Sequence, residues 1–283
     1  MNGGKLMSES VQPAIELVLS DIDGTLLRPD HSLTQATVDA ITRLREAGIL
    51  FTVASSRPPR AMRQIIEALD VRLPTVAFNG ALITHPDGQV LAAHHIPTHA
   101  ARTCLELFAS QDVAVWVFAD DQWLLQDLDG AYVDHERETL GYDPVLVDSF
   151  EPYLGRVDKI VASSADFERL RSLETEVNPQ ICGAALAARS QDYYLDVTAA
   201  EANKGAALVA LANYLDVALA HTAAIGDGGN DVAMFGQAGL SIAMGQAQAS
   251  VAGQADKVTG TNLQDGVAMA IDRFILTAGR SSD

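Results

Sequence analysis

Residues 15–27, IELVLSDIDGTLL, decide the fold. Their first half is apolar and partly β-branched, which is typical of a buried strand. The chain then changes to Asp21, Ile22, Asp23, Gly24 and Thr25, and carboxylates two residues apart project to one side of an extended chain. Open α/β sheets bind their ligands at the carboxyl ends of the strands. This stretch therefore predicts a central strand that carries Asp21 and Asp23 into a site.

The composition indicates a globular protein with a sizeable core. The 283 residues are 48% hydrophobic and 20% charged, and they contain no run of 18 apolar residues that would predict a membrane span. The first residues, MNGGKLMSESVQP, lack the apolar centre of a secretion signal. We expect residues 1–13 to be a loose tail, with Met7 a possible alternative start, and the protein to be cytoplasmic.

The formal charge of −18 limits which ligands the protein is expected to bind. General nucleic-acid binding needs basic surface and is not expected. An anionic substrate would be repelled unless a bound divalent cation offset the charge locally. Cys104 and Cys182 provide neither a disulfide framework nor a zinc site, and we expect both to be buried thiols. The seven histidines show no metal-ligand spacing.

Strands and helices alternate at both ends of the chain, which predicts a parallel sheet. The first part, residues 14–83, has expected strands at 15–20, 49–54 and 75–78 and expected helices at 34–47 and 58–69. The last part, residues 196–283, has expected helices at 203–215 and 267–276, a short one through Met234, and expected strands at 223–226 and 240–244. We expect these two parts to form one domain.

The middle of the chain, residues 84–195, has a different rhythm. The change begins with a hairpin expected at 81–84 and 89–93, with a Pro-Asp-Gly turn. Further strands are expected at 113–118, 123–126, 157–163, 181–187 and 193–197, and helices at 98–110 and 165–177, while 130–153 is not assigned. This mixture predicts an inserted α+β domain. Its aromatic residues suit core packing or contact with a substrate: Trp116, Trp123, Tyr193 and Tyr194.

Polar clusters follow several strands of the predicted parallel sheet: Asp21/Asp23, Ser55/Ser56/Arg57, Asn79/Gly80 and Asp227/Asn230/Asp231. Each alone also fits a loop with capping residues. Together they would meet at one edge of the sheet. Two unit charges about 4 Å apart repel by about 4 kcal/mol at an effective dielectric constant near 20, so four carboxylates require a cation. Oxygen ligands without histidine or cysteine favour Mg²⁺.

Two further positions indicate anion binding. Ser55 precedes a helix that begins with proline, where a hydroxyl and backbone N–H groups make a phosphate seat, although capping fits equally well. Lys204 stands in the first turn of a predicted helix, where a cation opposes the helix dipole. The chain has few lysines, so we expect Lys204 to hold an anion, the alternative being an ordinary exposed lysine. The basic residues from Arg57 to Arg63 are expected to form a solvated helix face.

The motifs DIDGTLL, SSR, Lys204 with Gly205, and GDGGNDVAMF resemble, in order, the four motifs of the haloacid dehalogenase-like superfamily. NGA at 79–81, the large insertion, and the late QAQASVAGQADKVT and DGVA segments resemble its Cof-type phosphatases. The resemblance implies a Rossmann-like α/β core with an inserted α+β cap. Ser20, Ser55-Ser56 and Gln246 depart from the usual residues of the family, and none of these changes removes a catalytic group.

The resemblance also implies roles for individual residues. Asp21 matches the nucleophile that forms an aspartyl-phosphate, and Asp23 matches the general acid and base. Ser55 matches the phosphate-binding residue of the second motif. Lys204 matches the lysine that steadies nucleophile and phosphate. The full set expected to bind substrate or phosphate is Asp21, Gly24, Thr25, Ser55, Ser56, Arg57, Asn79, Gly80, Lys204 and Asn230.

The implied metal is Mg²⁺. Asp227 matches a ligand beside Asp21 and the backbone carbonyl of Asp23, and Asp231 matches a residue that contacts the metal shell or the phosphate. The expected metal set is therefore Asp21, Asp23, Asp227 and Asp231.

The sequence thus predicts a Mg²⁺-dependent phosphatase that acts on a small phosphorylated metabolite, either a sugar phosphate or a cofactor or nucleotide phosphate. Neither nucleic acid nor a membrane is an expected partner, and the oligomeric state stays open. A sugar-phosphate phosphomutase with the same nucleophile and a non-catalytic regulatory protein on the same fold are the alternatives.

Overall fold

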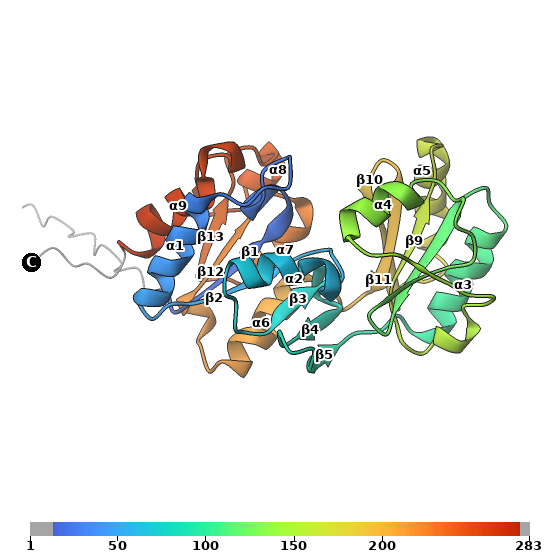
Figure 1. The fold of residues 1–283 in the computed structure, drawn as a ribbon, viewed down its shortest axis with the longest axis horizontal. Helices are drawn as coiled ribbons and strands as arrows, with labels where there is room; N and C mark the ends of the chain where they lie inside the picture. Colours follow the sequence, from blue (N-terminus) through green and yellow to red (C-terminus); the bar gives the residue numbers. More distant parts are fainter. Residues whose placement is uncertain (1–13, 278–283) are drawn as a thin grey trace, which may run out of the picture.

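Residues 14–277 are described by a computed structural model, in which two sheets lie side by side (Figure 1). The expected tail at 1–13 lies outside the described residues. The larger sheet has the order β14-β13-β12-β1-β2-β3-β4-β5. Its strands are β1 Leu17–Asp21, β2 Leu50–Ala54, β3 Thr75–Ala77, β4 Leu82–Thr84, β5 Val90–Ala93, β12 Thr222–Gly226, β13 Leu240–Ala243 and β14 Lys257–Val258.

Strand β1 lies in the interior of this sheet, parallel to both of its neighbours. Leu17 is opposite Thr222 of β12 and opposite Leu50 of β2. All five residues of β1 are buried, as expected for a strand that has helices on both faces. Asp21 therefore lies at the carboxyl end of a strand whose neighbours also end there.

Helices cover both faces of the larger sheet. On one face, α1 Gln35–Glu46, α2 Pro59–Ala68 and α9 Gly266–Ala270 pack around Val18 and Val53. On the other, α6 Lys204–Tyr214, α7 Val232–Phe235 and α8 Ala249–Ala252 pack around Leu17 and Leu19. The side chain of Asn203 accepts a hydrogen bond from the Ala206 N–H at 2.8 Å, which fixes the start of α6.

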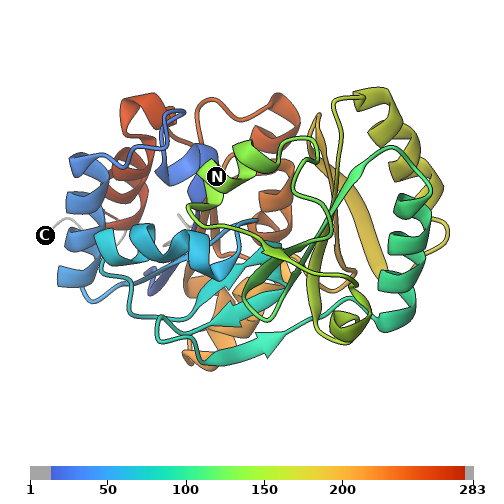
Figure 2. The ribbon, with the colours of Figure 1, turned by 45° about the vertical axis from the view of Figure 1, so that its right-hand side comes forward.

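The smaller sheet has the order β10-β11-β9-β6-β7-β8 and is antiparallel except for the β7–β8 pair. Helices α3 Thr98–Ala109 and α5 Phe167–Val177 cover its face away from the larger sheet, and α4 Val133–Leu140 lies on the nearer side (Figures 1 and 2). Its strands are β6 Ala114–Ala119, β7 Gln122–Leu125, β8 Val145–Leu146, β9 Val157–Ser163, β10 Ala185–Gln191 and β11 Tyr194–Ala199.

The predicted fold class is confirmed: a mostly parallel α/β sheet is combined with a second α+β unit. Some elements differ from the expectations. Strand β10 begins at Ala185 rather than at 181, because the turn that follows α5 uses residues 181–184, with Gly183 at φ +77°. The unassigned stretch 130–153 contains α4 and β8, and α4 escaped prediction because it has few apolar residues.

The boundaries expected at 84 and 195 do not coincide with the strand pairing. Strand β5 pairs with β4 in the larger sheet, because the hairpin extends that sheet by two antiparallel strands. Strand β11 runs through 195 to Ala199 in the smaller sheet. We therefore propose that the inserted domain begins after Ala93 and ends at Ala199.

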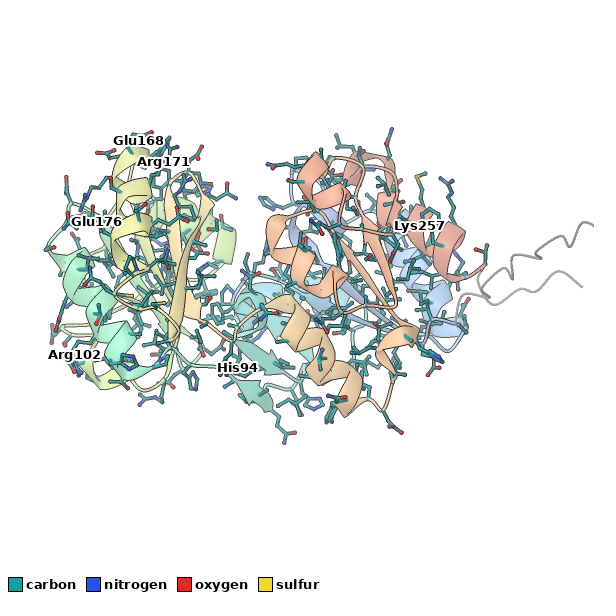
Figure 3. All side chains as sticks on the ribbon, turned by 180° about the vertical axis from the view of Figure 1, so that it is seen from behind. His94, Arg102, Glu168, Arg171, Glu176 and Lys257 are labelled. Carbon is teal, nitrogen blue, oxygen red and sulfur yellow. The ribbon has the colours of Figure 1, made fainter. Side chains whose placement is uncertain are left out.

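Two smaller expectations concern cysteine and the membrane. Cys104 is a buried thiol on α3, as expected, but Cys182 is exposed because it lies in the turn after α5. Within residues 14–277 we find no helix with the length and apolar character that crossing a membrane would require. Charged side chains such as Arg102, Glu168 and Arg171 lie on the outer side of the smaller sheet (Figure 3).

Candidate active site

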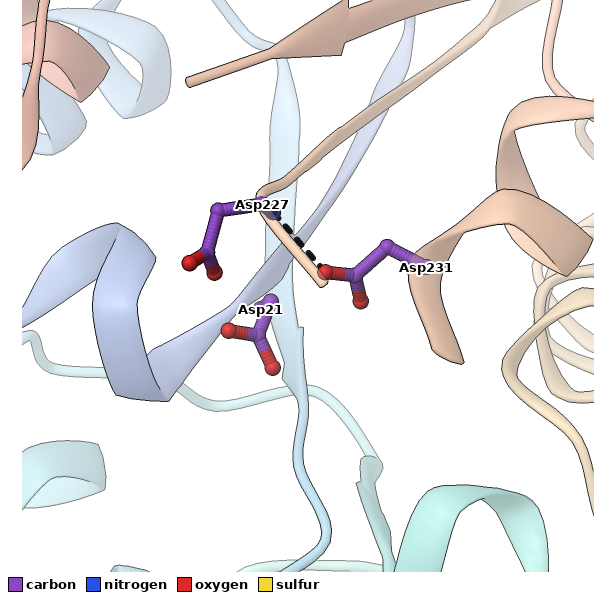
Figure 4. Close-up of side chains that lie close together, drawn as sticks. All are labelled: Asp21, Asp227 and Asp231. Carbon is purple, nitrogen blue, oxygen red and sulfur yellow. Dashed lines mark hydrogen bonds between the residues drawn. The ribbon is translucent and has the colours of Figure 1, made fainter. Parts of the chain in front are cut away.

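Three carboxylates meet at the carboxyl edge of the larger sheet: Asp21, Asp227 and Asp231 (Figure 4). Each offers one oxygen, and these oxygens all lie within 4.8 Å of one another. Asp21 ends β1, Asp227 directly follows β12, and Asp231 lies one turn further along the chain. Because β1 and β12 are parallel neighbours, the two loops are held together by the sheet itself.

Lys204 is the cation of this cluster. It is the first residue of α6, its side chain has no exposed surface, and its Nζ donates to Oδ1 of Asp21 and, at 2.6 Å, to Oδ1 of Asp231. Burial alone would lower the pKa of Lys204, but Asp21 and Asp231 raise it above its ordinary value. The ammonium group is therefore charged at neutral pH.

Asp231 holds the loop together. Its Oδ2 accepts hydrogen bonds from the backbone N–H groups of Asp227, at 2.9 Å, and Gly228, at 2.8 Å, while Oδ1 is bonded to Lys204. Gly226 permits this approach, since a Cβ there would lie 2.4 Å from the carboxyl carbon of Asp231. Both oxygens of Asp231 thus have partners in the protein. This geometry favours a supporting role beside the metal rather than direct coordination.

Burial and neighbouring carboxylates disfavour negative charge on Asp21 and Asp227, and Lys204 offsets this only in part. Burial raises the pKa of Asp21 well above its ordinary value, Lys204 lowers it, and the Asp231 carboxylate raises it again. Burial also raises the pKa of Asp227, whose Oδ1 accepts a hydrogen bond from Thr25 at 3.0 Å. Three carboxylates lie beside one lysine, so a bound cation would reduce the repulsion between the carboxylates. Its oxygen donors suit a hard ion such as Mg²⁺.

Gly24 lies against the same carboxylates. Its φ is +81°, and a Cβ there would lie 2.5 Å from Oδ2 of Asp227. Its carbonyl oxygen accepts a hydrogen bond of 2.5 Å from Nε2 of Gln246, which follows β13. Gly24 and Thr25 therefore pack against Asp227, and Gln246, which departs from the usual residue of the family, supports the backbone at Gly24.

Asp23 is separate from the three-carboxylate cluster. Arg57 binds it through two hydrogen bonds, Nε to Oδ2 at 2.8 Å and Nη2 to Oδ1 at 2.6 Å. The carboxylate turns to Arg57 because a guanidinium group matches both of its oxygens. The geometry thus gives no support to a metal role for the Asp23 side chain, and only its backbone carbonyl stays a candidate ligand. The side chain is 37% exposed, so solvent and substrate can reach it.

The residues after β2 make their hydrogen bonds to Asp23 and to one another, so they do not form an open site for phosphate. Ser55 is fully buried, its Oγ accepts the Arg57 N–H at 3.1 Å and donates to Asp23 Oδ2 at 3.5 Å. Ser56 is half-buried. Arg57, expected to bind phosphate, is occupied by Asp23 and only 13% exposed. The expectation of a solvated face from Arg57 to Arg63 is therefore wrong for Arg57.

Asn79 and Asn230 join the site from opposite loops. The Nδ2 group of Asn230 donates to Oδ1 of Asn79 at 2.9 Å. Gly80, at φ +112°, lies against the start of α6, because a Cβ there would be 2.5 Å from the Asn203 carbonyl oxygen. Gly80 thus supports the position of Lys204 rather than lining the site. Phe78 is also left-handed, at φ +49°, a rare conformation for a large side chain.

Contacts across the two sheets involve residues that sequence motifs do not reveal. The rings of Phe78 and Phe118 are 5.5 Å apart, and Arg60 lies 4.4 Å above the ring of Tyr142. Arg63 forms an ion pair of 3.4 Å with Asp121 in the turn between β6 and β7. The smaller sheet is therefore in contact with α2 and the Phe78–Gly80 turn, next to Asn79.

Comparison with known proteins identifies relatives over most of the chain. A family model described as haloacid dehalogenase-like hydrolase matches residues 18–271. An HMP-PP phosphatase of Cronobacter sakazakii (strain ATCC BAA-894) is 32% identical over 227 residues, which is 80% of this chain and 83% of the relative.

Two solved structures from Bacteroides thetaiotaomicron share the fold. A haloacid dehalogenase-like hydrolase is 25% identical, with a TM-score of 0.84 over 92% of this chain and 99% of the other. A phosphatase of the haloalkanoate dehalogenase superfamily is 28% identical, with a TM-score of 0.80 over 96% and 99% of the two chains. These alignments span both sheets.

Proposed function

This chain belongs to the haloacid dehalogenase-like hydrolase family and is a phosphatase, and on this basis we propose that it hydrolyses a small phosphorylated metabolite through a phosphoryl group carried on Asp21. The observation that carries the proposal is the position of Asp21. This carboxylate ends the buried strand β1, with Lys204 bound to its Oδ1 and Asp227 beside it. Within residues 14–277, Oδ2 of Asp21 accepts no hydrogen bond, so it is free to attack phosphorus.

The first step transfers the phosphoryl group to the enzyme. An oxygen of Asp21 forms a bond to phosphorus, and the bond between phosphorus and the oxygen of the leaving alcohol breaks. Asp23 donates a proton to that oxygen, and the alcohol departs. A carboxylate nucleophile divides a difficult hydrolysis into two easier transfers. Lys204 stabilises negative charge on the nucleophile and the transferring group, which is most of what phosphoryl transfer needs.

The second step restores Asp21. Asp23, now a carboxylate, takes a proton from water as the water oxygen attacks phosphorus, and the bond between phosphorus and Asp21 breaks. Inorganic phosphate leaves. Arg57 acts as a positioning residue, because its two hydrogen bonds hold the Asp23 carboxyl group where it reaches both the leaving oxygen and the incoming water.

The residues fit a bound Mg²⁺. Asp21, Asp227 and the Asp23 backbone carbonyl would hold it, and Asp231 would keep the Asp227 loop in place. When bound, the ion supplies positive charge to the transferring phosphoryl oxygens. The three carboxylate oxygens within 4.8 Å of one another, opposite the single cation of Lys204, support this assignment.

The relatives support a small phosphorylated substrate but do not identify which one. The Cronobacter relative is an HMP-PP phosphatase, and we propose for this chain a sugar phosphate or a cofactor or nucleotide phosphate of similar small size. We also propose a cytoplasmic location, since the two cysteines suit a reducing compartment.

The test uses p-nitrophenyl phosphate, whose leaving group needs no proton. The wild type with Mg²⁺ should turn over continuously and lose activity with EDTA. Asp23→Asn should release about one equivalent of nitrophenolate per enzyme in a burst and then stall, because water is no longer activated. Sustained turnover by Asp23→Asn would contradict the role of Asp23. A wild type that releases no phosphate would contradict the proposed function.

A further inference from the structure

Gln246 connects the turn that follows β1 to a distant part of the larger sheet. Its Nε2 group donates a hydrogen bond of 2.5 Å to the carbonyl oxygen of Gly24, and its Oε1 atom accepts one of 3.1 Å from the Asn262 N–H. Both ends of the amide are therefore bonded to backbone groups. One group belongs to the active-site turn, and the other lies between β14 and α9.

Folding stability gives Gln246 little reason to make these bonds. The residue is exposed. Ordering a glutamine side chain costs conformational entropy, and water can form the same hydrogen bonds with a free amide. The bridge between Gly24 and Asn262 therefore calls for a reason other than stability.

The turn at Gly24 has a backbone that gains from a fixed partner. Asp23 has φ −79° and ψ 123°, and Gly24 has φ +81° and ψ −11°, which are the angles of the two central residues of a type II β-turn. Such a turn favours glycine at its third position, and glycine leaves the chain more freedom than any other residue. A hydrogen bond to the Gly24 carbonyl oxygen restricts that freedom.

Gln246 also acts on the Asp227 carboxylate. Burial raises the pKa of Asp227, whereas hydrogen bonds from Thr25 and Gln246 lower it. Oγ1 of Thr25 is 3.0 Å from Oδ1 of Asp227. Gly24 packs so closely against the same carboxylate that a Cβ there would lie 2.5 Å from its Oδ2. Asp227 is thus held by the turn after β1 and by the residue that bonds to this turn.

The segment that carries Gln246 is itself closely packed. The N–H of Gly245 donates to the carbonyl oxygen of Gly260 at 2.9 Å, and a Cβ at Gly245 would lie 2.9 Å from the carbonyl carbon of Gly260. Nδ2 of Asn262 donates to the carbonyl oxygen of Leu27 at 2.9 Å. Gln246 therefore extends from a well-supported backbone to Gly24.

Positions near Asp227 matter for a cation because carboxylates repel one another. Oxygens of Asp21, Asp227 and Asp231 lie within 4.8 Å of one another (Figure 4). Both oxygens of Asp231 accept hydrogen bonds from Lys204 or from backbone N–H groups. Asp227 depends instead on hydrogen bonds from side chains. A ligand that is ordered before the ion arrives binds the ion more tightly, because less entropy is lost on binding.

We propose that Gln246 is a positioning residue of the cation site, which holds the Gly24 peptide and the Asp227 carboxylate together so that a divalent cation finds its oxygen ligands in place. This inference rests on the proposed function, in which Asp21 and Asp227 hold Mg²⁺. Gln246 acts through Gly24 and Asp227 and is not a ligand of the ion. Its loss therefore lowers the affinity for the cation and leaves the chemistry at saturating cation nearly unchanged.

The test measures cation binding without turnover. Mn²⁺ shares the preference of Mg²⁺ for oxygen ligands, and electron paramagnetic resonance measures its free concentration. Gln246→Met keeps the length of the side chain and removes both hydrogen bonds. It should raise the Kd for Mn²⁺ by tenfold or more, since partners of metal ligands contribute about 10–100-fold in affinity.

Turnover of p-nitrophenyl phosphate gives the second readout. In Gln246→Met, the Mg²⁺ concentration for half-maximal turnover should rise by the same factor as the Kd for Mn²⁺. The value of kcat at saturating Mg²⁺ should change less than threefold. A residue with a purely structural role would not produce this separation between cation affinity and kcat.

Two variants are the matched controls. Gln254→Met makes the same substitution at an exposed glutamine just after α8. Asn262→Ala removes the side-chain bond to Leu27 but keeps the backbone N–H that bonds to Gln246. Both should change the Kd for Mn²⁺ less than threefold. Circular dichroism verifies that the three variants are folded.

The outcomes separate the two proposals. A wild type that releases no phosphate contradicts the proposed function, and Mn²⁺ binding still decides this inference because it needs no turnover. An unchanged Kd in Gln246→Met overturns the inference, as does a wild type that binds no Mn²⁺. An equal loss of affinity in either control would also overturn it. An unfolded Gln246→Met would show that the residue serves stability instead.

Discussion

Within residues 14–277, two lysines form ion pairs with carboxylates, Lys204 at the edge of the larger sheet and Lys159 in the smaller one, and their surroundings differ. Lys204 is fully buried between Asp21 and Asp231, on loops that follow parallel strands. Lys159 lies in the middle of an antiparallel strand beside Asp196, and both side chains keep some access to solvent. Lys204 belongs to a tightly connected network of carboxylates and backbone groups, whereas Lys159 and Asp196 form a largely buried pair on one face of a sheet.

This difference is relevant to phosphoryl transfer. Phosphoryl transfer has the same geometry for every substrate, so its groups gain from being fixed by backbone hydrogen bonds and close glycine contacts. We therefore expect changes in the Lys204 cluster to affect the turnover of every substrate.

The largest effect is expected for Asp21→Asn. Removing the nucleophile should lower kcat by at least about 10⁴-fold on every substrate, because the oxyanion interactions that remain cannot replace covalent catalysis. The measurement is phosphate release, with circular dichroism to verify folding. Retained turnover in a folded protein would exclude Asp21 as the nucleophile.

Lys204→Met should affect both catalysis and folding. It leaves Asp21 and Asp231 buried without their cation, and breaking a buried pair of this kind costs about 3–5 kcal/mol. We expect kcat to fall by about 10²–10³-fold on all substrates and the unfolding midpoint in urea to fall.

Lys257→Met is the control for this variant, since Lys257 is an exposed residue of β14 far from the smaller sheet (Figure 3). It should change neither quantity. Equal decreases of kcat and of the urea midpoint in Lys204→Met and Lys257→Met would contradict the role of the buried Lys204 ion pairs.

A smaller effect is expected for Gly24→Ala. Both Gly24 and Gly48 have left-handed backbones, at φ +81° and +77°, so alanine should cost about 1–2 kcal/mol of stability at either position. Only at Gly24 would the new Cβ meet the Asp227 carboxylate, at 2.5 Å, whereas nothing lies within 4 Å at Gly48. We expect Gly24→Ala to weaken Mg²⁺ activation by tenfold or more and Gly48→Ala to leave it unchanged, measured by Mg²⁺ titration of turnover.

The smallest effect on turnover is expected for Asp158→Asn, near the start of strand β9 of the smaller sheet. Burial raises the pKa of Asp158 to about 6, although His95 at 2.9 Å lowers it. A carboxyl group with a raised pKa binds more protons in the folded state, so its contribution to stability falls as the pH rises from about 4 to 6 and is constant above.

Over that range the wild type should lose about 3 kcal/mol more stability than Asp158→Asn, since one pKa unit corresponds to about 1.4 kcal/mol. Urea denaturation at several pH values measures the two slopes. Parallel slopes would show that Asp158 ionises at its ordinary pKa.

The sequence was most informative where function depends on local backbone. Asp21 and Asp23 after an apolar strand, Gly24 in the turn, and Lys204 at a helix start predicted one edge of one sheet, and the structure brings all of these residues to that edge. Parallel strands place their carboxyl ends together whatever the intervening chain does. The predicted roles of these residues remain proposals for the experiments above.

The sequence by itself thus determined the fold class and the family, because short strands, glycine turns and fixed spacings are properties of neighbouring residues. Only the tertiary structure decided which side chains and strands contact one another. Arg57 binds Asp23, and β5 pairs within the larger sheet. Both carboxylate oxygens of Asp231 accept hydrogen bonds from the protein, and Lys159 pairs with Asp196. These contacts join residues that are far apart in the chain or depend on side-chain direction, and no local pattern specifies them.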